Sequence, residues 1–139
     1  MSVPEGKRGN GKFEVLVKAL ELATYTIKIT KNPKTFTPEY QSALTDDIIR
    51  TAKDIYIKCW SANNIRVTDA DKAKQRKELQ ESAILDTYTL TALVQIAKRI
   101  FHLSSKRVKF WTESAVEVRE YIRKWKNSDS KRYADYLSA

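Results

Sequence analysis

Apolar residues recur every three or four positions along four stretches of the chain, which is the spacing of one face of an α-helix. The first stretch runs from Phe13 to the Asn32-Pro33 pair, which would end a helix. Its apolar positions are Leu16, Val17, Leu20, Ala23 and Ile27. The second stretch begins at Thr37-Pro38, a cap followed by proline at the first helical position, and runs to about Asn63-Asn64. Its apolar positions are Tyr40, Leu44, Ile48, Ala52, Ile55 and Cys59.

A third helix is predicted from Thr68 or Asp69, either of which can cap it, to about Leu103. The fourth helix begins at Ser104 or Ser105 and has the most regular pattern in the chain. Its seam is Val108, Trp111, Ala115, Val118, Ile122 and Trp125. Ser128-Asp129 resembles a further cap, which would open a short last helix through Tyr133, Tyr136 and Leu137. We therefore expect an all-α fold, an antiparallel four-helix bundle with a short C-terminal helix, as one domain over residues 13–139.

Glycine and proline are confined to the first part of the chain. All three glycines and all three prolines come before position 39. The rest of the chain therefore has neither the usual residues of tight hairpins nor a glycine-rich phosphate loop, which excludes P-loop and Rossmann-type nucleotide binding. Residues 1–12 contain the three glycines and Pro4 among polar residues, and this composition predicts a flexible basic arm.

The third helix has more apolar surface than one seam can bury. Between positions 83 and 101 its apolar residues cover more than one face. They are Ala83, Ile84, Leu85, Tyr88, Leu90, Leu93, Val94, Ile96, Ile100 and Phe101. Two compatible interpretations remain open: a wide core with this helix at its centre, and an interface between copies of the chain.

The charge balance is strongly basic. The 139 residues include 26 Lys or Arg against 17 Asp or Glu, a net charge of +9, which favours an acidic partner such as nucleic acid or an anionic membrane. One candidate phosphate-binding group surrounds the predicted turn between the third and fourth helices: Lys98, Arg99, Lys106, Arg107 and Lys109. The other follows the second half of the fourth helix: Arg119, Arg123, Lys124, Lys126, Lys131 and Arg132. The alternative is a solvated face that only keeps the protein soluble.

Catalytic and metal chemistry have little support in the sequence. One cysteine, Cys59, and one histidine, His102, cannot form a disulfide within the chain or supply a Cys/His zinc tetrad. We expect Cys59 in the core and His102 at a helix end, and therefore no enzyme activity, no cofactor and no metal. No apolar run approaches the roughly 20 residues of a membrane span, and the first twelve residues lack the apolar stretch of a signal peptide. These observations predict a cytoplasmic protein without a membrane partner.

Several short motifs resemble a known family. They are the Phe36-x-Pro38 entry to the second helix, Ala62-Asn63 at its end, the Arg76, Gln80 and Ala83 spacing, and the Trp125, Ser128, Asp129, Arg132 and Tyr133 tail. Over about residues 13–136 the chain resembles the small four-helix-bundle proteins that include the 23S ribosomal RNA intervening-sequence proteins and the accessory variability determinant (Avd) proteins of diversity-generating retroelements. The stretch 61–64, Ser-Ala-Asn-Asn, lacks the glycine of the Asn-Ile-Ala-Glu-Gly-like turn common in the first group, which favours the Avd branch.

The resemblance implies a ring-like homopentamer with a basic surface. It further implies a non-catalytic accessory protein that associates with a reverse transcriptase and with its template RNA, or an RNA/DNA hybrid, during mutagenic cDNA synthesis. The alternative is a helical structural or interaction protein of the intervening-sequence type without a nucleic-acid role.

Overall fold

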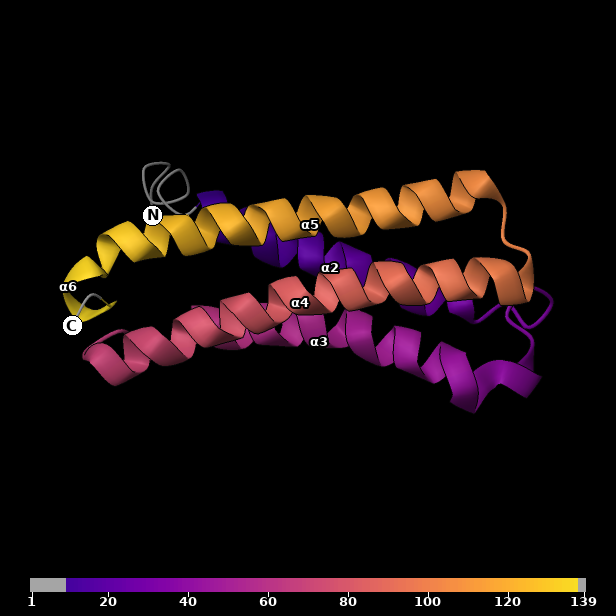
Figure 1. Ribbon diagram of the computed structural model, residues 1–139, viewed down its shortest axis with the longest axis horizontal. Coiled ribbons are helices and arrows are strands. Elements are labelled where there is room, and N and C mark those ends of the chain that lie inside the picture. The colour runs from indigo at the N-terminus through magenta and orange to yellow at the C-terminus, as the bar shows by residue number, and fades with distance from the viewer. Residues whose placement is uncertain (1–9, 138–139) are drawn as a thin grey trace.

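The computed structural model describes residues 10–137, and over this range the chain forms helices and no strand (Figure 1). Four of the helices are long: α2 (Asn10–Thr30), α3 (Asp46–Asn63), α4 (Ala70–Phe101) and α5 (Ser105–Arg132). A short helix, α6 (Ala134–Leu137), ends the described chain. The all-α fold class predicted from the hydrophobic periodicity is thus confirmed. None of the described helices combines the length and the apolar character needed to cross a membrane.

The starts of α4 and α5 are fixed by side-chain caps. The Asp69 carboxylate accepts a hydrogen bond from the backbone N–H of Lys72 at 2.9 Å, and this bond lowers the pKa of Asp69. The Ser104 hydroxyl accepts one from the N–H of Arg107 at 3.1 Å. At the other end of α4, His102 adopts the left-handed conformation (φ 56°) that commonly ends a helix. Both predicted caps are confirmed, and His102 lies at a helix end as expected.

Three predicted boundaries differ from the structure. Thr37 has an extended backbone but makes no side-chain cap bond, and the chain passes through a 3₁₀ turn, η1 (Pro38–Tyr40), and a π-helical turn, η2 (Gln41–Thr45), before α3. The predicted cap at Ser128-Asp129 is wrong, because α5 continues to Arg132 with Asp129 buried inside it. The first long helix begins at Asn10, within the segment predicted as an arm; residues 1–9 lie outside the described residues.

The long helices pack side by side around a common apolar core. α2 packs against α3 and α5, α3 against α4, and α4 against α5. The whole predicted seam of the fourth helix is buried, as is Cys59 of α3. On α2 the predicted face is wrong in part, since Leu20 is exposed and the core face instead carries Val15, Ala19, Leu22 and Thr26. The polar Thr26 obscured this face in the sequence; its hydroxyl accepts a hydrogen bond from the indole N–H of the buried Trp111 at 3.0 Å.

The two ends of the molecule differ in what they contain (Figure 1). We call one the turn end: it holds the turn between α4 and α5 and the connection from α2 to α3. The other, the terminal end, holds the connection from α3 to α4 and the short helix α6. The two basic groups identified in the sequence therefore lie toward opposite ends of α5.

Candidate nucleic-acid interface

The turn end gathers basic side chains from three segments of the chain. The last turn of α4 ends in Lys98 and Arg99, and the first turns of α5 carry Lys106, Arg107 and Lys109. The end of α2 and the connection after it add Lys28, Lys31 and Lys34, which the sequence analysis missed. These residues are distant in sequence from the α4–α5 turn, and only the packing of α2 along α5 brings them near it. We call these eight residues the turn-end cluster.

The cations of the turn-end cluster are electrostatically unpaired. Within residues 10–137, none of the eight forms an ion pair, and the first turn of α5 contains no acidic residue. The N-terminus of a helix already carries a partial positive charge, and acidic side chains are the ones that stabilise it. Here two basic residues, Lys106 and Arg107, occupy the first turn instead. The same end also carries Glu39 of η1 and Asp46 and Asp47 in the first turn of α3, but none of these forms an ion pair with the cluster within residues 10–137. The cluster therefore remains a concentration of positive charge that can attract an anion.

Arg119, predicted to contact phosphate, lies inside the molecule. Arg119 is only 9% exposed. Its Nε donates a hydrogen bond to the Thr87 hydroxyl at 2.8 Å, and its guanidinium lies 3.6 Å from the centre of the Tyr88 ring. These contacts join α5 to α4. Arg119 was expected on an exposed basic surface, but the side chain is buried. The proposed interface therefore does not include Arg119.

Of the other basic residues in the second half of α5, Arg123 and Lys126 form ion pairs within the molecule, whereas Lys124 and Lys131 form none within residues 10–137. Arg123 binds Glu120 at 2.8 Å and donates to the Tyr88 hydroxyl, a bond that lowers the pKa of Tyr88 and raises that of Arg123. Lys126 lies 3.5 Å from the Glu81 carboxylate. Two residues complete the group: Lys124, with its ammonium 5.9 Å from the Tyr121 ring, and the exposed Lys131.

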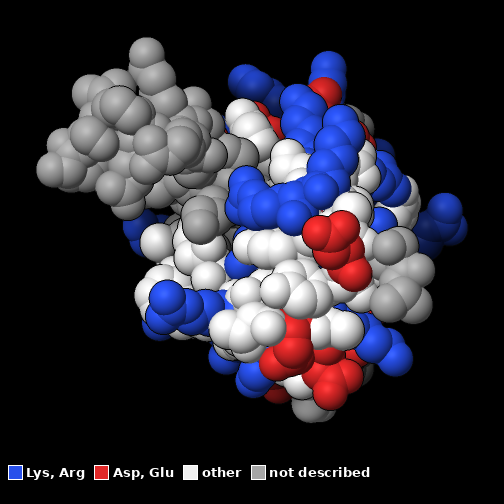
Figure 2. Space-filling view, turned by 90° about the vertical axis from the view of Figure 1, so that its left-hand side faces the viewer, with Lys and Arg blue, Asp and Glu red and all other residues white. Residues whose placement is uncertain are grey.

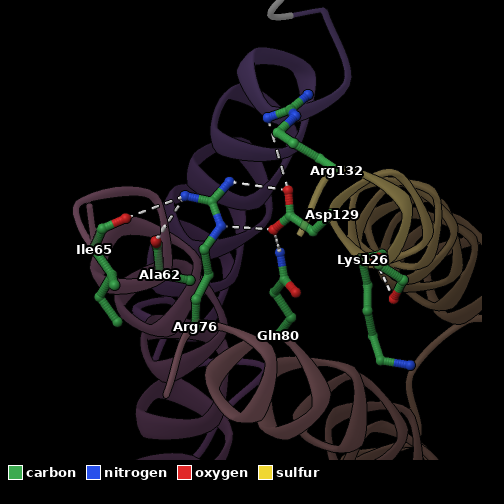
Figure 3. Close-up of polar contacts among 8 residues, drawn as sticks. Ala62, Ile65, Arg76, Gln80, Lys126, Asp129 and Arg132 are labelled. Atoms are coloured by element: carbon green, nitrogen blue, oxygen red, sulfur yellow. Dashed lines mark hydrogen bonds and ion pairs between the residues drawn. The ribbon is translucent and has the colours of Figure 1, made fainter. Parts of the chain in front are cut away.

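Arg132 is exposed and lies at the edge of a buried polar network at the terminal end (Figure 3). At its centre Arg76 of α4 donates from Nε to Asp129 of α5 at 2.6 Å and from Nη2 at 3.2 Å. Gln80 donates to the same carboxylate at 2.8 Å, and the Arg132 guanidinium lies 3.9 Å from it. Arg76 also donates to the carbonyl oxygens of Ala62 and Ile65, at the end of α3 and just beyond it.

The charge at the terminal end is mixed. Figure 2 looks onto this end and shows acidic side chains among the basic ones. Asp69 and Asp71 at the start of α4 and Asp135 of α6 lie in this part of the fold. Of the two basic groups predicted from the sequence, the one at the α4–α5 turn is therefore the better placed to attract a polyanion.

The two residues considered for catalysis occupy different environments. Burial raises the pKa of the Cys59 thiol to about 12, so the reactive thiolate form is disfavoured. His102 is exposed at the α4–α5 turn, next to the turn-end cluster. Within the part of the chain that the structure describes, His, Cys, Asp and Glu side chains form no cluster that could hold a metal ion.

Fold and surface together define an all-α protein of four long helices with a cation-rich end. Comparisons of the chain with protein-family models, with curated proteins and with solved structures found no match.

Proposed function

We propose that the protein is a non-catalytic nucleic-acid-binding accessory protein that assists the reverse transcriptase of a diversity-generating retroelement in template-RNA-dependent mutagenic cDNA synthesis. In this proposal the four long helices form an antiparallel four-helix bundle, the protomer of a homopentamer. Two independent arguments support it: the resemblance of the sequence motifs to the Avd proteins, and the electrostatics of the turn-end cluster.

The observation that carries the proposal is the contrast between the two ends of α5. Cations that already have partners in the protein would have to give them up before they could bind phosphate. Those of the turn-end cluster have no ion-pair partner among the described residues to lose. RNA, or an RNA/DNA hybrid, supplies the closely spaced phosphates that such a cluster neutralises, and the counterions released from the nucleic acid drive the binding.

The test is the salt dependence of RNA binding by the double variant Arg107→Ala/Lys109→Ala. If both side chains contact phosphate, the slope of log K against log[salt] flattens by about two, roughly one for each lost contact. Preference among RNA sequences stays unchanged, since phosphate contacts do not read bases. Fluorescence anisotropy with labelled RNA at several salt concentrations measures both, and thermal unfolding should barely change, since exposed charges contribute little to stability.

A matched control removes the same charge elsewhere. Lys53 of α3 and Lys74 of α4 are exposed and lie outside the turn-end cluster. Lys53→Ala/Lys74→Ala should keep the wild-type slope, and so should Arg123→Ala/Arg132→Ala, whose side chains are already engaged. Equal slopes for all variants and the wild type would contradict the proposal that the turn end binds nucleic acid.

A second candidate function, a helical interaction protein, is favoured by the outer face of α4. Leu85, Tyr88, Ile96 and Ile100 of this helix are all exposed, and Leu85 is 65% exposed. This face bears the surplus apolar residues noted in the sequence, and exposed apolar stripes mark contacts between proteins. In the accessory-protein proposal the same stripe is the contact between copies of the chain.

A further inference from the structure

Phe110 is a large aromatic side chain exposed beside the turn-end cluster. The residue is 56% exposed, although it lies in the second turn of a helix that packs along both α2 and α4. Its ring touches Tyr25 of α2, with centroids 5.1 Å apart and planes at 66°. Tyr25 in turn meets the ring of the buried Trp111 at 6.1 Å. Phe110 therefore packs on Tyr25 on the side of its ring that faces the core, while much of the ring remains exposed to solvent.

The charges around Phe110 are arranged asymmetrically. On the side of the turn lie Lys106, one helical turn earlier, and Lys109, the preceding residue; Lys28 lies one turn beyond Tyr25 on α2. On the other side lie Glu113, one helical turn later, and the carboxylates of Glu21 and Glu117, 3.8 Å and 3.9 Å from the Lys18 ammonium. A polyanion is therefore attracted on the turn side of Phe110 and repelled or unaffected on the other, which fixes where a phosphate backbone would run.

A shallow hollow adjoins the ring between α2 and α5. Its volume is about 130 Å³, and it is lined by Lys18, Glu21, Leu22, Tyr25, Phe110, Ser114 and Glu117. The hollow therefore combines aromatic faces and hydroxyl groups, which suit an unpaired base, with the carboxylates of Glu21 and Glu117, which would keep phosphates out of it and on the turn side. Arg107 is close enough to Tyr25 to offset part of the rise that burial causes in the pKa of Tyr25, so the basic cluster and the hollow are contiguous.

We propose that Phe110 is a stacking platform for a base of single-stranded RNA whose phosphates lie on Lys28, Lys106 and Lys109. This inference rests on the proposed function and names its substrate class. Only an unpaired base can present its face to a protein ring, because in a duplex both faces are covered by neighbouring bases. Aromatic platforms beside a cationic track are the usual means of binding single strands without reading their sequence.

The test compares Phe110→Leu with the wild type on two probes: a fluorescein-labelled 12-nucleotide oligouridine and a labelled RNA duplex of similar length. Loss of one stacked base weakens single-strand binding about 5- to 100-fold. Duplex binding stays unchanged, and so does the salt slope, because no charge is removed. Phe110→Tyr restores single-strand binding, and Val116→Ala, at another exposed position of α5, has no effect.

The outcomes separate this inference from the proposed function. If Arg107→Ala/Lys109→Ala weakens RNA binding but Phe110→Leu does not, the nucleic-acid interface stands and the stacking platform is refuted. If Phe110→Leu weakens both probes equally, the ring does not select single strands and the inference is also refuted. A change in oligomer mass with unchanged RNA affinity would assign Phe110 to a protein contact instead, and binding of neither probe by the wild type would remove the proposed function itself.

Discussion

At the scale of residues, the buried ion pair between Arg76 and Asp129 links two helices. The two side chains are 5% and 6% exposed, and two hydrogen bonds from one guanidinium to one carboxylate join α4 to α5. The Arg76 guanidinium also lies 5.3 Å from the centre of the Trp125 ring. Burying two ions costs desolvation, which the paired geometry offsets. We therefore expect the pair to contribute more to the register of α4 against α5 at the terminal end than to net stability.

Asp129→Ala should lower the free energy of unfolding by about 3 to 5 kcal/mol, because it leaves the Arg76 charge buried without its partner. The double variant Arg76→Met/Asp129→Leu should recover much of that loss, since neither charge then remains. Urea unfolding of the wild type, Arg76→Met, Asp129→Leu and the double variant gives the coupling energy. Additive losses would mean that the two side chains do not act as a pair.

At the scale of elements, α5 contributes a continuous row of buried residues to the core. Its buried positions run from Val108 through Trp111 to Trp125 and continue to Asp129 with the same alternating spacing. Trp111 is fully buried, touches Tyr25 and Phe36, and donates its indole N–H to Thr26 of α2. The regular spacing made this seam predictable from the sequence, whereas the burial of Asp129 was not predicted because a polar residue there resembled a cap.

Trp111→Ala should destabilise the protein by about 3 to 5 kcal/mol, as truncation of buried aromatic side chains generally does. The cavity removes contacts from α2 and α5 together and leaves the Thr26 hydroxyl without its donor. Chemical denaturation followed by circular dichroism measures the loss. Val116→Ala, at an exposed position of the same helix, should change stability by less than about 0.5 kcal/mol. A loss below about 1 kcal/mol for Trp111→Ala would contradict the central role of this seam.

At the scale of the whole molecule, a charged end adjoins an apolar side. The turn-end cluster occupies one end, and the exposed apolar residues of α4 follow its outer face from Leu85 to Ile100, which lies in the helical turn that also carries Lys98 and Arg99. A protein that binds its own copies through the sides of its helices keeps its ends free for another partner. In the proposed homopentamer, five turn-end clusters would then act on one nucleic acid, which raises the effective concentration of sites.

Light scattering should therefore give the mass of a pentamer for the purified protein at about micromolar concentration. Leu85→Glu/Ile96→Glu places charges on the outer face of α4 and should yield a monomer, because a buried unpaired carboxylate is costly. Its circular dichroism should stay that of a helical protein, since both positions are exposed within the chain. A monomer mass for the wild type would contradict the homopentamer and weaken the case drawn from the Avd resemblance.

The sequence by itself determined the helical class, the caps at Asp69 and Ser104 and the seam of α5, because these depend on neighbours three or four positions away along one helix. Only the tertiary structure decided which polar residues are buried in the core and which cations have no ion-pair partner within residues 10–137. Arg119 and Asp129 are buried because residues of α4 satisfy them, and Lys28 and Lys31 join the turn end because α2 packs along α5. The partners of a charge lie on other helices, and periodicity along one helix does not contain that information.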